Sequence, residues 1–278
     1  MQGAGTLKTR TDEIVIAAML PVAQVTPYAL ARRAAEAPVL LTYQFSRVML
    51  PLAAQLGARN EHDRLRAVFL TGTRLTLAAY LACACALAVL GGPFLAAWVG
   101  EEYRSAAAIL VVLAIASGID MSRWTPDSVL QGVSKHRPLA LFAIIGAGLN
   151  LILSILLIGP VGLGPIGAAY GTLIATVIEA VVLTIPFAMR RLGIGAAAVL
   201  GSVALPALVP AIPATTVALG LTWLIDPGSF ISIIGIGIVA AAAYVATYFA
   251  FAASAPERTL ALSGARALMV RMRRPANA

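Results

Sequence analysis

The stretch PLALFAIIGAGLNLILSILLI, residues 138–158, contains no charged side chain. It is long enough to cross a bilayer as one helix, since a crossing takes about 20 apolar residues. Similar apolar stretches recur along the chain, separated by short segments rich in charge, glycine or proline. We therefore expect an all-α, polytopic helical membrane protein with about eight transmembrane helices. The expected helices cover residues 12–26, 28–57, 66–90, 105–132, 138–158, 165–190, 196–225 and 229–253.

The composition excludes the soluble classes of protein. Of the 278 residues, 60% are hydrophobic and only 12% are charged, whereas a soluble domain carries about 25% charged residues. The mean hydropathy is +0.91. A soluble enzyme and a disordered chain are both inconsistent with these values.

The net charge of +8 predicts an orientation in the membrane. Basic residues concentrate at the two termini and in alternate loops, and Arg104 is the one basic residue in the opposite loops. By the positive-inside rule, both termini are expected to be cytoplasmic, and no nucleic-acid partner is needed to explain the charge. The clustered residues are Lys8, Arg10, Arg59, Arg64, Arg66, Lys135, Arg137, Arg190 and Arg191, with Arg258, Arg266, Arg271, Arg273 and Arg274 in the tail.

Six polar side chains of the helix expected at 28–57 lie on one stripe about 120° wide. They are Arg32, Arg33, Glu36, Tyr43, Gln44 and Arg47. One interpretation is the wall of a water-filled cavity that binds an anionic head group, because arginine holds phosphate through two hydrogen bonds. The alternative is internal pairing of Arg32 with Glu36, four residues apart, with the other arginines reaching toward the membrane surface.

Charged residues recur in two later spans. Asp120, Arg123 and Asp127 share an arc of about 100° with Trp124 and Gln131. They predict either an acid that responds to protons or cations beside a transport pathway, or an Asp–Arg–Asp structural lock.

Two further charges inside predicted spans also need an explanation. Glu179 is expected in mid-span, on one face with Thr172 and Thr176, as a site residue or as a partner for an arginine. Arg74 is expected to reach toward the cytoplasmic surface.

Several motifs fail to support an enzyme or a cofactor. GLGPIG, residues 162–167, spells a nucleotide-binding fingerprint, but no strand precedes it. Gly164, Gly167 and Gly171 are expected instead to allow close helix packing. Cys83 and Cys85 point to different sides of a helix, and the histidines lie in separate loops, so neither a disulfide nor a metal site is expected. No loop exceeds about ten residues, which disfavours a glycosyltransferase.

A family resemblance follows from several segments. They are RTDEIVI (10–16), YALARR (28–33), Pro51 with the basic loop 59–66, LQG (130–132) followed by KHR (135–137), Asn150, and GLGPIGAAYG (162–171). Over roughly residues 10–191, the chain resembles polysaccharide flippases, the oligosaccharide-lipid exporters of the MATE-like superfamily.

The resemblance implies an architecture and a function. Such proteins have two six-helix lobes around a central cavity and flip undecaprenyl-pyrophosphate-linked sugars across the bacterial inner membrane. Here residues 12–191 would form the second lobe, 192–254 two additional helices, and 255–278 a basic cytoplasmic tail. The cavity arginines would be Arg32 and Arg33, and the family's intramembrane aspartate would be Asp12. The expected partners are the lipid-linked sugar, membrane lipids, and the missing N-terminal lobe or a second subunit.

The chain departs from that family at its start. Residues 1–11, MQGAGTLKTRT, are polar and form no signal peptide, so the chain is expected to begin inside a transmembrane helix. One lobe cannot enclose a pathway alone. The alternatives are therefore a non-transporting scaffold or fragment, and a drug or cation antiporter of the same superfamily. An antiporter should present acids to the cavity, so the arginines of residues 28–57 argue against it.

Overall fold

The structure is a computed structural model that describes residues 2–134, 137–254 and 257–259, without the side chains of 1–10, 41 and 43–48. Within these residues it contains helices and no strand, which confirms the predicted class. Lys135, His136 and the tail beyond 259, which carried part of the predicted basic charge, lie outside the described residues.

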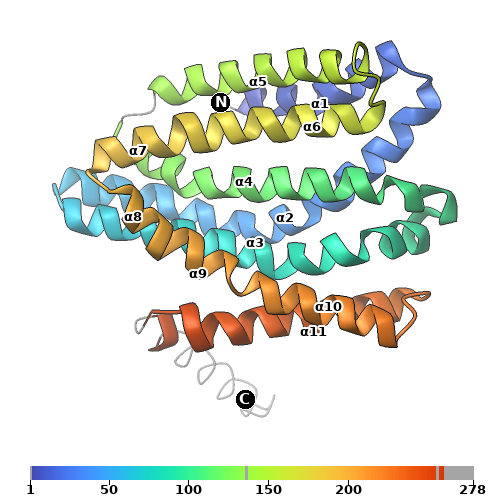
Figure 1. The fold of residues 1–278 in the computed structure, drawn as a ribbon. Coiled ribbons are helices and arrows are strands. Elements are labelled where there is room, and N and C mark those ends of the chain that lie inside the picture. Colours follow the sequence, from blue (N-terminus) through green and yellow to red (C-terminus); the bar gives the residue numbers. More distant parts are fainter. Residues whose placement is uncertain (1, 135–136, 255–256, 260–278) are drawn as a thin grey trace, which may run out of the picture.

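The helices lie side by side as elongated rods (Figure 1). The first rods are α1 (Gln2–Met19), α2 (Val25–Ala58, preceded by η1, Val22–Gln24), α3 (His62–Val99), α4 (Ala107–Gly132, preceded by η2, Glu101–Ala106) and α5 (Arg137–Ile158). The next rod joins α6 (Pro165–Val177), η3 (Ile178–Thr184) and α7 (Ile185–Leu192). The last two rods are α8 (Ala196–Val199), η4 (Leu200–Ala204), α9 (Leu205–Leu208) and α10 (Ala211–Leu224), followed by α11 (Phe230–Thr247) with η5 (Tyr248–Ala252).

Six of these rods are long and apolar enough to cross a membrane, namely those from α3 onward. The first half of α2 carries Arg32, Arg33 and Glu36. The chain is therefore a multi-pass helical membrane protein in which α1 and α2 are the polar members.

The predicted boundaries of the first helix were wrong. The helix expected at 12–26 begins at Gln2 and ends at Met19, so most of the polar segment 1–11 is helical. Pro21 explains the end, because proline has no N–H to continue a helix and disfavours helical geometry in the residue before it. The helix expected at 66–90 is also longer and runs to Val99, where Gly100 ends it with φ +124°.

The rods connect at two ends of the bundle. At one end, which we call the basic end, α2 joins α3, α4 leads to α5, and α7 joins α8, close to Arg59, Arg64, Arg190 and Arg191. α3 and α4 lie in the middle of the bundle, with α5 and α6 on one flank and α8–α11 on the other (Figure 1). The rod α8–α10 crosses α3 obliquely (Figure 1), and its helix is interrupted at Val209 and Pro210, between α9 and α10, because proline has no N–H for the helical hydrogen bond.

Glycines allow α5 and α6 to approach closely, which confirms the packing prediction for two of three positions. A Cβ placed on Gly171 would lie 2.8 Å from the Ser154 Oγ and 2.9 Å from its backbone N. A Cβ on Gly167 would lie 2.9 Å from the carbonyl carbon of Leu157. Gly164 lies in the turn before α6 with φ +65°, so the backbone conformation explains this glycine rather than packing.

Arg74, which was expected to reach toward the cytoplasmic surface, is buried and forms an ion pair with Glu257. Its Nη2 lies 2.5 Å from Glu257 Oε1, and both side chains are only 10% exposed. Arg74 Nη1 also donates to the backbone oxygen of Ser202 at 3.4 Å, and Glu257 Oε2 accepts from the backbone N of Ser254 at 2.7 Å. This ion pair fastens α3 to η4 and to the segment that follows η5.

Candidate functional site

A half-open hollow of about 280 Å³ lies between α1, α2, α4 and α6. Five charged residues line it: Asp12, Arg32, Glu36, Asp120 and Arg123. The lining therefore holds three carboxylates and two guanidinium groups. Charges at membrane depth are costly against lipid, so this hollow must face water or protein.

Asp12 lies at the inner side of the hollow and is 3% exposed. Its Oδ2 accepts hydrogen bonds from the Tyr28 hydroxyl and the Thr172 Oγ1, each at 2.7 Å. Its Oδ1 accepts from the Asn150 Nδ2 at 3.0 Å and lies 3.3 Å from the Ser154 Oγ. Four helices, α1, α2, α5 and α6, thus converge on one carboxylate.

This network supplies one acidic group surrounded by neutral oxygens. The Oδ1 of Asn150 lies 3.2 Å from Thr172 Oγ1 and 3.3 Å from Ser154 Oγ, so these side chains also contact one another. Oxygen ligands of this kind suit a hard cation, and a single carboxylate matches one positive charge, such as a proton or a monovalent ion. In the described part of the chain, no three His, Cys, Asp or Glu side chains gather as a metal site would require.

The family resemblance pointed to Asp12, but none of its four hydrogen-bond partners was predicted to lie beside it. Tyr28 and Ser154 were not singled out as site residues, although Asn150 and Ser154 stand four residues apart in a span without any charge. Two polar side chains on one face of such a helix are a readable signal for a buried network.

Arg32 is 13% exposed and lies between Glu36, which lines the hollow, and Glu13, which does not. Its Nε donates to Glu36 Oε1 at 2.9 Å, and its Nη1 lies 3.6 Å from Glu13 Oε1. Nη1 is nevertheless buried and makes no hydrogen bond within the described structure. The predicted Arg32–Glu36 pair is therefore present, and one nitrogen of the guanidinium retains hydrogen-bonding capacity.

The other members of the predicted α2 stripe divide into two groups. Arg33 is exposed and does not line the hollow, and among the described side chains it has no ion pair. The side chains of Tyr43, Gln44 and Arg47 lie outside the described part of the structure. The stripe is therefore tested only in its first half, where Arg32 and Glu36 face the hollow together.

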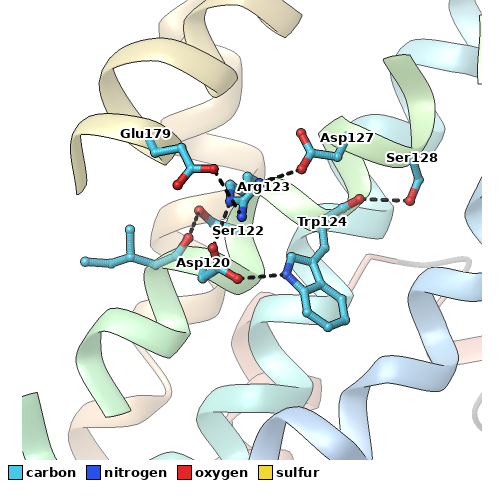
Figure 2. Close-up of polar contacts among 8 residues, drawn as sticks. Asp120, Ser122, Arg123, Trp124, Asp127, Ser128 and Glu179 are labelled. Atoms are coloured by element: carbon cyan, nitrogen blue, oxygen red, sulfur yellow. Dashed lines mark hydrogen bonds and ion pairs between the residues drawn. The ribbon is translucent and has the colours of Figure 1, made fainter. Parts of the chain in front are cut away.

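A second cluster surrounds Arg123, as Figure 2 shows. Its Nε lies 2.8 Å from Asp120 Oδ1, its Nη1 2.8 Å from Asp127 Oδ2, and its Nη2 3.4 Å from Glu179 Oε1. The indole N–H of Trp124 donates to Asp120 Oδ2 at 3.0 Å. We call Asp120, Arg123, Asp127 and Glu179 the Arg123 cluster. One guanidinium thus contacts three carboxylates from two rods, α4 and the rod from α6 to α7.

Glu179 joins this cluster from a different helix. It is 1% exposed and lies in η3, a π-helical segment that interrupts the rod from α6 to α7. Gly146 of α5 leaves room for its carboxylate, because a Cβ at that position would collide with Glu179 Oε2. Of the two roles predicted for Glu179, the structure shows the partner of an arginine. π-Helical turns are frequent at functional sites, so a role in a pathway stays a prediction.

Comparison with known proteins places the fold. No family model matches the chain. The chain is 25% identical over 197 residues to "Uncharacterized membrane protein EpsK" of Bacillus subtilis (strain 168), which covers 71% of this chain and 38% of that protein. It superposes on the outward-facing conformation of a multidrug resistance MATE family transporter of the MOP superfamily with a TM-score of 0.54 and 19% identity, over 89% of this chain and 60% of that one. The chain thus spans less than two thirds of either protein, and its fold is that of part of a MATE transporter.

Proposed function

We propose that this chain forms one lobe of a membrane transporter that flips a lipid-linked oligosaccharide, with the head group crossing beside α2. The observation that carries the proposal is Arg33, an exposed arginine without an ion pair among the described residues, next to Arg32 at the rim of a polar hollow. Arginines bind the oxygens of a pyrophosphate through paired hydrogen bonds. The lipid tail would remain in the bilayer while the charged head group crosses in water.

A second lobe is part of this proposal. The hollow is not enclosed by this chain and carries charges that hydrocarbon cannot solvate. The chain also spans only 60% of the MATE transporter that it resembles in fold. A second six-helix lobe, from a separate subunit or a longer chain, would close the hollow into a cavity, as alternating access between two repeats requires.

We assign the coupling of transport to Asp12 and its network, with the Arg123 cluster as a second acidic group along the pathway. Asp12, Asp120 and Arg123 line one continuous hollow, so a proton or cation bound at either place changes the charge that the substrate meets. Binding energy that differs between two conformations is what couples an ion to transport.

Export of a drug or another cation is the second candidate, and the charge of the hollow favours it. Sequence reasoning set this alternative aside because arginines were expected to dominate the cavity. The hollow instead contains Asp12, Glu36 and Asp120 against Arg32 and Arg123. A lining with more acids than bases attracts cations.

Charge substitutions on α2 separate these candidates. In cells that lack a polysaccharide flippase, this chain would be co-expressed with a matching first lobe. Under the flippase proposal, Arg33→Gln and Arg32→Gln should reduce surface polysaccharide strongly while Arg33→Lys retains part of it, and Arg64→Gln, at the basic end, serves as the control. Normal export with normal membrane abundance in both Gln variants would refute the proposal. If expression of the two lobes instead made cells tolerant to cationic drugs, and Asp120→Asn abolished that tolerance, export of a drug or another cation would be the function.

The orientation is tested separately. We propose a bacterial inner membrane with both termini in the cytoplasm, on the charge pattern of the loops. A cysteine introduced at Gly228 should react with an impermeant thiol reagent in intact cells, and one at Arg191 should not. The opposite labelling pattern would invert the proposed orientation.

A further inference from the structure

α4 separates the polar hollow from a second, apolar groove on its other side. Asp120 and Arg123 face the hollow, whereas Ile119 and Ser122, each one residue away, line the groove. The groove has a volume of about 480 Å³ and lies between α3, α4, η3 and the rod α8–α10. That volume falls in the range of small-molecule pockets, roughly 300–1,000 Å³.

The lining of the groove offers few hydrogen-bonding groups to water. None of its lining residues in the described chain is charged. Its main polar side chains are satisfied by backbone oxygens: Tyr80 donates to Ala114, Ser122 to Ile119 and Thr73 to Phe69, each at 2.6 Å. Water needs two to four polar partners to remain in a cavity, so this groove favours an apolar occupant.

The mouth of the groove is lined by exposed apolar side chains. Ile115 of α4, Val181 of η3 and Leu208 of α9 line it and are 51%, 49% and 50% exposed. All three belong to rods that are long and apolar enough to span a membrane. The medium at this mouth is therefore the interior of the bilayer, and its abundant component is the phospholipid acyl chain.

The direction and length of the groove also match those of a lipid acyl chain. Along α3 it extends from Phe69 to Ala88, which is about 28 Å at 1.5 Å per residue. The hydrocarbon core of a bilayer is about 30 Å thick. The groove thus runs nearly parallel to the chains of the surrounding lipids and is long enough for one acyl chain.

We propose that this groove binds an acyl chain of a membrane phospholipid, which fills the space between the lobe and the rod α8–α10. The π-helical turns η3 and η4 both contribute lining residues, Val181 from the first and Val203 with Ala204 from the second. These turns widen their rods locally and shape the groove. The proposal is independent of any transported substrate, because α4 separates the groove from the hollow.

Crosslinking from a photoreactive acyl chain tests the proposal. The full chain would be reconstituted in phosphatidylethanolamine and phosphatidylglycerol vesicles with a trace of phospholipid that carries a diazirine along one acyl chain. Adducts at Ala84 and Cys85, which line the groove and are each 7% exposed, should exceed those at Ala82 and Ala86 several-fold. The control residues are 9% and 7% exposed on the same helix but do not line the groove. Equal adduct yields at all four positions would overturn the proposal.

A groove-filling variant and a solvent test complete the experiment. Ala204→Phe should reduce the adduct at Cys85 several-fold, while Ala198→Phe, on the exposed surface of the same rod, should leave it unchanged. If Ala204→Phe does not fold, the unaltered protein provides the test. Rapid reaction of Cys85, but not of Cys83, with a charged impermeant thiol reagent would mean that water fills the groove and would overturn the proposal. Complete displacement of the phospholipid adduct by trace polyprenyl alcohol would identify an isoprenoid occupant and would also overturn the assignment.

Discussion

Replacing Arg123 by glutamine should destabilise the protein far more than replacing Glu179. Arg123 is the one guanidinium that contacts Asp120, Asp127 and Glu179 in the described structure. Arg123→Gln would remove the guanidinium that contacts these three poorly hydrated carboxylates. Glu179→Gln would remove one acid from a cluster that already contains more acid than base, and it would remove the longest of the three contacts, at 3.4 Å.

The magnitude follows from the short contacts. Two unit charges about 4 Å apart attract each other by about 4 kcal/mol at an effective dielectric constant of 20. Arg123 makes two such contacts, at 2.8 Å between nitrogen and oxygen, with side chains that are 19%, 27% and 18% exposed. Desolvation offsets much of this attraction, and removing one member of a buried pair costs about 3–5 kcal/mol. Partial exposure of these side chains favours the lower end, so we expect about 3 kcal/mol for Arg123→Gln and less than about 1 kcal/mol for Glu179→Gln.

The assay is unfolding by sodium dodecyl sulfate in mixed micelles, followed by tryptophan fluorescence. A loss of about 3 kcal/mol corresponds to roughly a hundredfold shift in the unfolding equilibrium. Arg64→Gln is the matched control, because Arg64 is 73% exposed and its pair with Glu61 lies at the surface. The reasoning would be refuted if Arg123→Gln unfolded like the unaltered protein, or if Glu179→Gln were equally damaging.

Three further outcomes follow from the packing and polar networks. Gly171→Ala should lower the unfolding temperature, since overpacking costs about 1–3 kcal/mol, whereas Gly148→Ala, with open space around it, should not; equal effects in a thermal scan would contradict the close approach of α5 and α6. Arg74→Met should strongly destabilise the protein because it leaves Glu257 as an unpaired buried charge. Adding Glu257→Gln should recover much of the lost stability, since both buried charges are then removed. A double variant no more stable than Arg74→Met would exclude the ion pair. Asp12→Ala should cost about 1–3 kcal/mol in the mixed-micelle assay by leaving its hydroxyl and amide partners unsatisfied, and an unchanged midpoint would rule out the network.

Much of the fold was predictable because hydrocarbon restricts the possible structures. Only helices satisfy their backbone hydrogen bonds within one segment of lipid-embedded chain, so an uncharged stretch such as 138–158 leaves no alternative. Pairs within one helix were equally readable: Asp120, Arg123 and Asp127 are three and four residues apart, and that spacing alone brings them together. Those interactions depend on the geometry of one helix and on nothing beyond it.

Contacts between distant segments could not be predicted from spacing. Arg74 was expected to reach toward the surface, yet its partner Glu257 lies 183 residues further along the chain. The same limit applies to Tyr28 and Asp12, whose contact depends on the turn that Pro21 introduces between α1 and α2. The balance of acidic and basic side chains in the hollow could not be predicted either, because it depends on which side chains of α1, α2 and α4 line the same hollow.

The pairing of arginines determines where an anionic substrate could bind. Among the intramembrane arginines whose side chains are described, Arg74 is matched by Glu257, Arg123 by three acids, and Arg32 by Glu36 and Glu13. Paired guanidinium groups contribute little net positive charge to the space that they line. Arg33 is the exception: it is exposed, does not line the hollow and has no ion pair among the described side chains. Under the proposed function, a pyrophosphate would therefore bind at Arg33 rather than deep in the hollow, and at Arg32 it would have to compete with Glu13, which lies 3.6 Å from the otherwise unbonded Nη1.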